Sequence, residues 1–183
     1  MACAIEAIDS GQDCGLIEGG ILYSYATKLE NITAVTKDAN DQITAITMTG
    51  TGLWEKWEYD VDNTALYEQP GSRNVNRITY AQRAFLKFKG ITNAYRSAAQ
   101  KASECCNVVV IHRLSTGAAI VQGLENSTVT CGFTKTRVLE TRVVPTLTTD
   151  TSQNEPRLEL SVEGTANSLS LFTTLTDAAI EAL

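Results

Sequence analysis

The chain has 183 residues, a formal net charge of −6, and no apolar run approaching the roughly 18 to 20 residues of a membrane-spanning helix. This length favours one domain with a sizeable core, and we expect residues 1–183 to form a single β domain. The acidic balance argues against a dedicated nucleic-acid binder, which is usually basic overall. No charged stretch followed by an apolar segment opens the chain, so we expect a cytosolic protein at synthesis.

The charges are distributed unevenly. Residues 1–68 contain twelve acids and three bases, whereas residues 69–103 contain seven bases and no acid. Oppositely charged surfaces steer association and fix its register, so this distribution indicates self-association. Separate solvated faces of a monomer remain an alternative explanation.

In chain order, we expect an N-terminal arm over residues 1–19, a strand at 23–26, and a hairpin joining 32–36 to 43–49. Two aromatic-rich strands follow at 53–59 and 78–88. The connection between them, residues 60–77, is long for a compact domain and is a candidate binding loop. Because Trp54 and Trp57 lie three residues apart in a predicted strand, they should face opposite sides, with at most one in the core.

The pattern then changes to a helix over residues 92–106, where Thr92 is placed to cap the first amides. Small side chains at helical spacing should let this helix approach a sheet closely. They are Ala94, Ala98, Ala102 and Cys105.

A second hairpin is predicted from 108–113 and 118–122, with Gly117 in its turn, and further strands at 129–133 and 137–144. Residues 148–156 resemble a linker. The clearest strand covers 157–163 and should end at Gly164, and a short C-terminal helix should cover 176–183. In the 157–163 strand, period two places Leu158, Leu160 and Val162 on one face and both glutamates on the other. The fold class is therefore mostly β (α+β): an antiparallel β-sandwich or barrel with one flanking α-helix and a short C-terminal helix.

Catalytic and metal-binding signals are weak. The single histidine, His112, should lie on the same strand face as Val108 and Val110, as a structural side chain. The five cysteines have irregular spacing without a zinc pattern, and we expect buried, reduced thiols. A Cys-His nucleophilic pair stays open, because such partners need not be neighbours in sequence. We expect no enzymatic activity, no catalytic or metal-binding residues and no cofactor.

The mostly β pattern with one short helix, a long loop between long strands and the final strand Leu158-Glu159-Leu160-Ser161-Val162-Glu163-Gly164 resembles the tail tube proteins of tailed bacteriophages and the tubes of contractile injection systems. The resemblance covers most of the chain but includes no diagnostic motif. It implies a virion structural protein that forms homohexameric rings, stacked as a DNA conduit in the phage tail. The cysteine-bearing opening and the Cys105-Cys106 pair depart from the family, so a head-to-tail connector or another minor virion protein remains an alternative.

The resemblance also implies site residues. Leu66 to Arg77 would match the loop that reaches a neighbouring ring, with subunit-interface candidates Tyr67, Gln69, Arg73, Asn74 and Arg77. Glu159 and Glu163 are candidates for a polar face or an acidic lumen. The implied partners are further copies of the chain, other virion proteins, and DNA that passes without specific binding, with no membrane. A different surface-binding module, an enzyme and a nucleic-acid binder are the remaining function classes.

Overall fold

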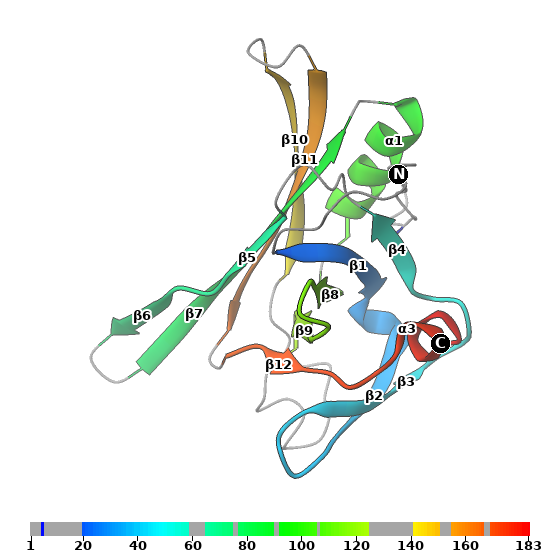
Figure 1. Ribbon diagram of the computed structural model, residues 1–183, viewed down its shortest axis with the longest axis vertical. Helices are drawn as coiled ribbons and strands as arrows, with labels where there is room; N and C mark the ends of the chain where they lie inside the picture. Colours follow the sequence, from blue (N-terminus) through cyan, green and yellow to red (C-terminus); the bar gives the residue numbers. More distant parts are fainter. Residues whose placement is uncertain are drawn as a thin grey trace.

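A computed structural model describes residues 5, 20–58, 65–74, 77–89, 92–105, 107–124, 141–150, 155–166 and 169–183. The described residues form antiparallel sheets and two α-helices, and Figure 1 shows that the protein is mostly β, which confirms the expected fold class. The strands are β1 (Ile21–Lys28), β2 (Ile32–Lys37), β3 (Ile43–Met48), β4 (Glu55–Glu58), β5 (Leu66–Glu68), β6 (Gly71–Asn74), β7 (Arg77–Lys89), β8 (Val108–Leu114), β9 (Ala119–Gln122), β10 (Arg142–Asp150), β11 (Glu155–Ala166) and β12 (Leu171–Phe172). The helices are α1 (Asn93–Ser103) and α3 (Asp177–Glu181), and a 3₁₀ turn covers Leu29–Asn31.

The strands form two larger sheets and one separate hairpin. The inner sheet has the order β12-β9-β8-β1-β4, and the outer sheet has the order β10-β11-β7-β5, with β6 pairing with the first residues of β7. Strands β2 and β3 form a two-stranded sheet of their own, and Ile43 of β3 also makes an isolated bridge with Thr173. Figure 1 shows the beginning of β7 with β6, and the β10–β11 pair, extending away from the body.

The inner sheet is buried on both faces. Alternate residues of β8 enter different clusters: Val108 and Val110 belong to one, and Val109 and Ile111 to the other. This explains why β8 begins with a continuous apolar run rather than an alternating one.

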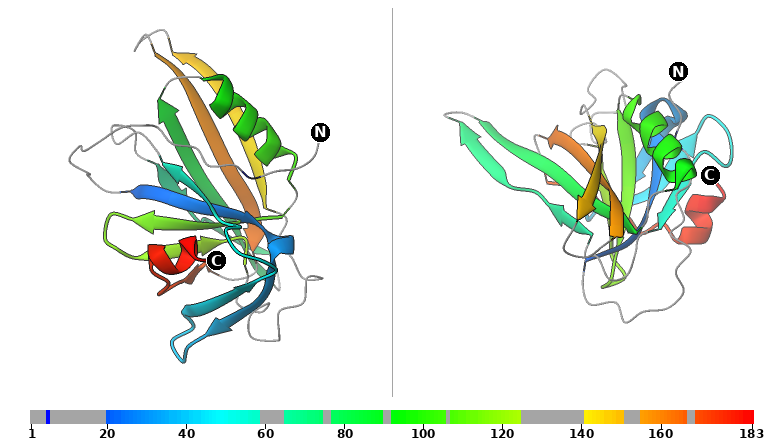
Figure 2. Two further views of the ribbon diagram at one scale, coloured as in Figure 1. Left: turned by 90° about the vertical axis from the view of Figure 1, so that its right-hand side faces the viewer. Right: turned by 90° about the horizontal axis from the view of Figure 1, so that it is seen from above.

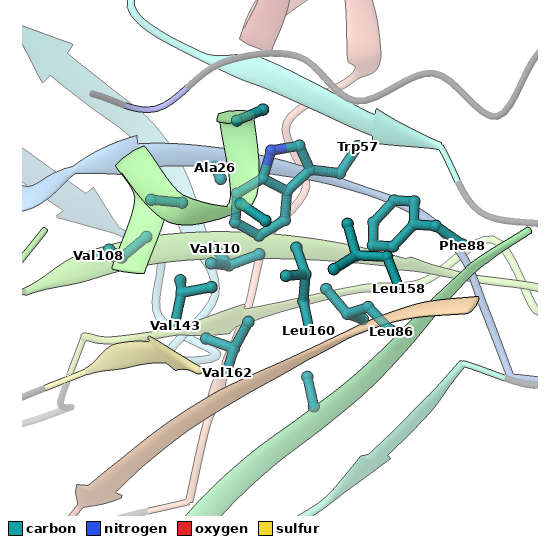
Figure 3. Close-up of a cluster of buried hydrophobic side chains, with 14 of the residues drawn as sticks. Ala26, Trp57, Leu86, Phe88, Val108, Val110, Val143, Leu158, Leu160 and Val162 are labelled. Atoms are coloured by element: carbon teal, nitrogen blue, oxygen red, sulfur yellow. The ribbon is translucent and has the colours of Figure 1, made fainter. Parts of the chain in front are cut away.

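The first cluster lies between the inner and outer sheets (Figure 3). Trp57 of β4 meets side chains of β7 and β11, among which Leu86, Leu160 and Val162 are fully buried. Helix α1 closes this cluster beside β10 and β11, as Figures 1 and 2 show. As predicted, Thr92 caps α1, and its Oγ1 accepts from the Tyr95 amide at 3.1 Å.

The second cluster lies on the other face of the inner sheet, under the β2–β3 hairpin and α3. Ile180 of α3 is fully buried there. Polar contacts also join α3 to strands β1 and β8 of the inner sheet. Asp177 accepts from the Tyr23 hydroxyl and from Arg113 Nε, the latter at 2.6 Å, and Glu181 accepts from the Tyr25 hydroxyl at 2.7 Å. A five-residue helix has little stability alone, so these contacts hold it in place.

Several predicted elements occur with shifted limits. Both hairpins and the C-terminal helix are present, and the 157–163 strand is confirmed within a longer β11. Gly164 does not end it, because β11 continues to Ala166 opposite β7. The expected linker at residues 148–156 is wrong for its described part. Residues 148–150 belong to β10 and pair with residues 155–157 of β11. The predicted 129–133 strand and the first part of 137–144 lie outside the described residues.

Three further expectations were wrong. Trp54 and Trp57 are both buried, at 7% and 0% exposure, because the inner sheet is covered on both faces. The second half of the expected loop 60–77 forms β5 and β6, which pair with β7. Ala94 is exposed, and α1 packs instead through Ala98, Ala99 and Ala102.

Candidate assembly surface

One face of the outer sheet packs on the core, while its other face is turned outward. Along β7 and β11 the burial alternates, so that residues such as Leu86 and Leu160 point inward while Lys87 and Glu159 point outward. Strand register places the outward residues in rows that cross the sheet. These rows form the surface described below.

A charged row crosses all four strands. Pairing aligns Arg142 of β10, Glu163 of β11, Arg83 of β7 and Glu68 of β5, so the charge alternates in sign from strand to strand. Arg83 Nη1 lies 3.7 Å from Glu68 Oε1, and Glu163 accepts from the Ser161 hydroxyl at 2.7 Å. The row therefore starts positive at the β10 edge and ends negative at the β5 edge.

An apolar row lies beside it. Register aligns Val144, Ser161, Phe85 and Leu66, and the two edge residues Val144 and Leu66 are 45% and 51% exposed. These side chains line a groove of about 510 Å³. Exposed apolar side chains gathered in a groove are typical of interaction surfaces.

The third row contains Thr146, Glu159 and Lys87, with 3.9 Å between Lys87 Nζ and Glu159 Oε1. Glu159 and Glu163 thus share the outward face, as the strand pattern predicts. Each lies beside a base from a neighbouring strand. Across the three rows the described acids and bases balance, which differs from the acidic lining expected for a lumen.

Both ends of the outer sheet are edges among the described strands. One edge is β10, and the other is formed by β5 and β6. Pro145 lies in the middle of β10, where an unbroken register with β11 is consistent with its missing N–H facing away from the sheet. An open strand edge can pair with a strand of another molecule, and Pro145 would divide such pairing at β10 into two stretches.

The five interface candidates occupy different environments. Tyr67 points inward, with its ring centroid 5.5 Å from that of His112, and burial raises its pKa to about 12. Gln69 Oε1 accepts from the Ser170 amide at 3.0 Å. Arg73 is exposed on β6, and the backbones of Asn74 and Arg77 form the last described pair of the β6–β7 ribbon. Tyr67 and Gln69 thus have internal contacts, and Arg73 lies on a projecting surface.

Ion pairs within the chain involve bases of both the acidic and the basic part of the sequence. Lys28 Nζ lies 3.5 Å from Glu30, and Lys37 and Lys56 pair with Asp41 and Glu58. Glu68 of the acidic part meets Arg83 of the basic part. The first three pairs lie within residues 1–68 and leave the net charge of that part unchanged, whereas the Glu68–Arg83 pair joins the acidic and the basic parts.

His112 belongs to a buried hydrogen-bonded chain that the sequence did not reveal. Its Nδ1 lies 2.7 Å from Ser24 Oγ, and its Nε2 lies 2.9 Å from Gln122 Oε1. Gln122 Nε2 donates to the Val162 carbonyl of β11 at 2.8 Å. Period two could have indicated part of this chain, because Gln82 shares its face with Ala84 and Leu86 and is fully buried.

This arrangement has the order of a nucleophile, a base and an orienting group, but it is not placed for catalysis. Ser24 and His112 are both 0% exposed, and neither lines the outer-sheet groove or the hollow beside Tyr23 and Arg113. Burial lowers the His112 pKa to about 4, partly offset by its bond with Gln122, which makes it a weak base. The expected structural placement of His112 on a buried strand face is confirmed.

The expectation of reduced thiols was wrong for Cys105, which is disulfide-bonded and 1% exposed. The other four cysteines lie outside the described residues. Cys105 lies just beyond the end of α1 and belongs to the first cluster. Within the described ranges, no three histidine, cysteine or acidic side chains form a group able to hold a metal ion.

No helix in the described part of the chain has the length and apolar character needed to span a membrane. Comparison with protein-family models, with curated proteins and with solved structures finds no match to this chain.

Proposed function

We propose that this chain is a structural protein that assembles with copies of itself through the outer sheet into rings, stacked as the tube of a phage tail. The observation that carries the proposal is the outer sheet, which has an outward apolar row and, among the described strands, two unpaired edges, with Arg142 on β10 and Glu68 on β5 at the ends of one charged row. Its partners are then identical copies and other virion proteins, with DNA passing through the tube. The role is structural rather than catalytic.

The strand directions in the outer sheet allow β10 of one copy to pair antiparallel with β5 of another. The pairs β10–β11, β11–β7 and β7–β5 are all antiparallel, so β10 and β5 run in opposite directions. If rotation about a ring axis places β10 of a second copy beside β5 of the first, the new pair is again antiparallel, and the same face stays on the same side. The sheet can then continue from copy to copy without a parallel junction.

The edge side chains support the same pairing. Val144 and Leu66 bring exposed apolar surface to the two edges, and Arg142 and Glu68 bring opposite charges. Closing a barrel requires tilted strands, so the copies would join with a stagger rather than with their rows exactly in line. Opposite edge charges favour the encounter across a range of staggers.

The test is assembly of the purified chain, followed by mass photometry and negative-stain microscopy. Rings that stack into tubes support a tail tube, whereas rings of fixed height without tubes support the connector alternative. A monomer at micromolar concentration that does not assemble on seeding overturns both.

A matched pair of variants tests the edge. Val144→Arg places a charge at the exposed β10 edge and should abolish ring formation while leaving the fold intact. Thr116→Arg, in the exposed turn between β8 and β9, adds the same charge and should assemble normally. Equal assembly of both variants would exclude this edge as the contact.

A further inference from the structure

The hydrogen-bonded chain around His112 links the centres of the two sheets by polar contacts. Gln122 of the inner sheet donates to the Val162 carbonyl at 2.8 Å and the Gln82 carbonyl at 3.4 Å, both in the outer sheet. In return, Gln82 Oε1 accepts from the Gly123 amide at 3.3 Å. We call this set of contacts the inter-sheet joint.

The joint continues outward from Gln82. Its Nε2 donates to Ser170 Oγ at 2.9 Å, and Ser170 Oγ also contacts the Tyr67 hydroxyl. Ser24, Gln82, His112 and Gln122 are all 0% exposed. Polar groups buried to this degree are costly unless their hydrogen bonds are formed, so the stability of the joint depends on keeping these hydrogen bonds intact.

The contacts fix the imidazole tautomer. Because Gln122 Nε2 donates to backbone carbonyls, its Oε1 faces His112 and must accept from Nε2–H. His112 Nδ1 is then the acceptor, and the Ser24 hydroxyl donates to it. A second proton on the ring would occupy Nδ1 and leave the Ser24 proton without this acceptor.

We infer that the inter-sheet joint is an acid-operated switch, in which protonation of His112 separates β9 of the inner sheet from β7 and β11 of the outer sheet. The charged imidazolium would lie in a region closed to water. Its Nδ1–H would also have to donate to Ser24 Oγ, where the neutral ring accepts from the Ser24 hydroxyl. Opening the joint gives water access to the charge. Closing it again requires loss of the proton.

The surroundings of His112 offer little to stabilise a charge. On the outer sheet, Tyr67 of β5 is the titratable group facing it, while β7 and β11 contribute Gln82 and the Val162 carbonyl. On the inner sheet, Glu55 of β4 and Lys28 of β1 lie on the same face as His112. Glu55 pairs with the β1 residue two positions after Ser24, and Lys28 lies four positions after Ser24, so both are farther along the sheet. Arg113 and Tyr23 contact α3 on the opposite face.

The direction of the pH effect follows from burial. The His112 pKa is lowered from 6.5 to about 4, so the open or unfolded chain binds the proton more tightly than the closed one. The closed joint is fully stable above pH 6.5 and weakens as the pH falls toward 4. Its equilibrium constant should fall by up to about tenfold per pH unit in that range.

The experiment follows the chain from pH 7.5 to 3.5 by imidazole NMR, amide exchange and near- and far-UV circular dichroism. His112 is the single histidine, so its signal is unambiguous. We expect a neutral Nε2–H imidazole above pH 5, then titration in the same step as faster exchange at Gly123 and loss of near-UV signal, while far-UV β signal persists. Titration near pH 6.5 with unchanged exchange would overturn the inference, as would simultaneous loss of the near- and far-UV signals.

Two variants separate the charge from simple loss of packing. His112→Gln keeps a polar side chain that cannot be charged. The stability of the closed joint in this variant should therefore lack the fall between pH 6.5 and 4 that protonation of His112 causes in the parent chain. Val110→Ala is matched to it, since Val110 is fully buried on the same face of β8, and should keep the full pH dependence at lower stability. Identical pH profiles for both variants would contradict the role of His112. If His112→Gln fails to fold, the NMR measurement on the parent chain decides the question.

Discussion

Replacing Gly123 by alanine should destabilise the protein strongly. Gly123 follows β9 with φ +95°, and an added Cβ would lie 2.5 Å from the Val108 carbonyl oxygen and 3.2 Å from Val109 Cα. Both neighbours are backbone atoms of the central strand β8, which cannot move aside as a side chain could. Positive φ costs an L-residue about 1–2 kcal/mol, and overpacking typically adds about 1–3 kcal/mol. We therefore expect Gly123→Ala to lower the free energy of unfolding by about 2–5 kcal/mol.

Gly117 provides the matched control. Its φ is +84°, but no heavy atom lies within 4 Å of an added Cβ. Gly117→Ala should therefore cost only the conformational part, about 1–2 kcal/mol. The assay is urea unfolding followed by tryptophan fluorescence, with midpoints compared at an unchanged m-value. Equal losses for the two variants would refute the close approach of Gly123 to β8.

Three other variants test separate parts of the structure. Ile180→Ala should cost about 2–5 kcal/mol in the same assay, because Ile180 is the fully buried side chain of α3, and a loss below about 1 kcal/mol would contradict the docking of this helix. Cys105→Ser should lower stability by about 2–5 kcal/mol, whereas a melting temperature unaffected by both the variant and a reductant would show that the disulfide does not support α1. The double variant Arg73→Glu, Arg77→Glu should fold but assemble poorly, and assembly of the parent should weaken as salt rises. Normal assembly with reduced DNA retention would instead assign these bases to nucleic-acid binding.

Local sequence patterns predicted the strands well where one face of the strand is buried and the other is exposed to solvent. In β11, Leu158, Leu160 and Val162 alternate with polar residues, and the structure buries these three side chains. The same reasoning failed for Trp54 because its cover comes from elements distant in sequence. Periodicity within one strand cannot show how many layers lie above it.

The outward surface of the outer sheet was less predictable. Glu163 was expected on a polar face, but its position between Arg142 and Arg83 depends on the register of β10, β11 and β7. No short-range signal fixes a register between strands separated by so many residues. The inter-sheet joint was missed for a similar reason, since Ser24, His112 and Gln122 meet only after three strands have paired.

The cover on the second face of the inner sheet has a consequence for biosynthesis. Thr173 Oγ1 donates to the Ile43 carbonyl at 2.9 Å, and Ile180 packs in the same cluster as Tyr25 and Ile43. Residues 171–183 therefore complete a layer begun in the first quarter of the sequence. While the chain is being translated, the apolar face of the early strands stays uncovered until these late residues leave the ribosome. Chaperones that bind exposed apolar strands would thus be needed until residues 171–183 have emerged and covered this face.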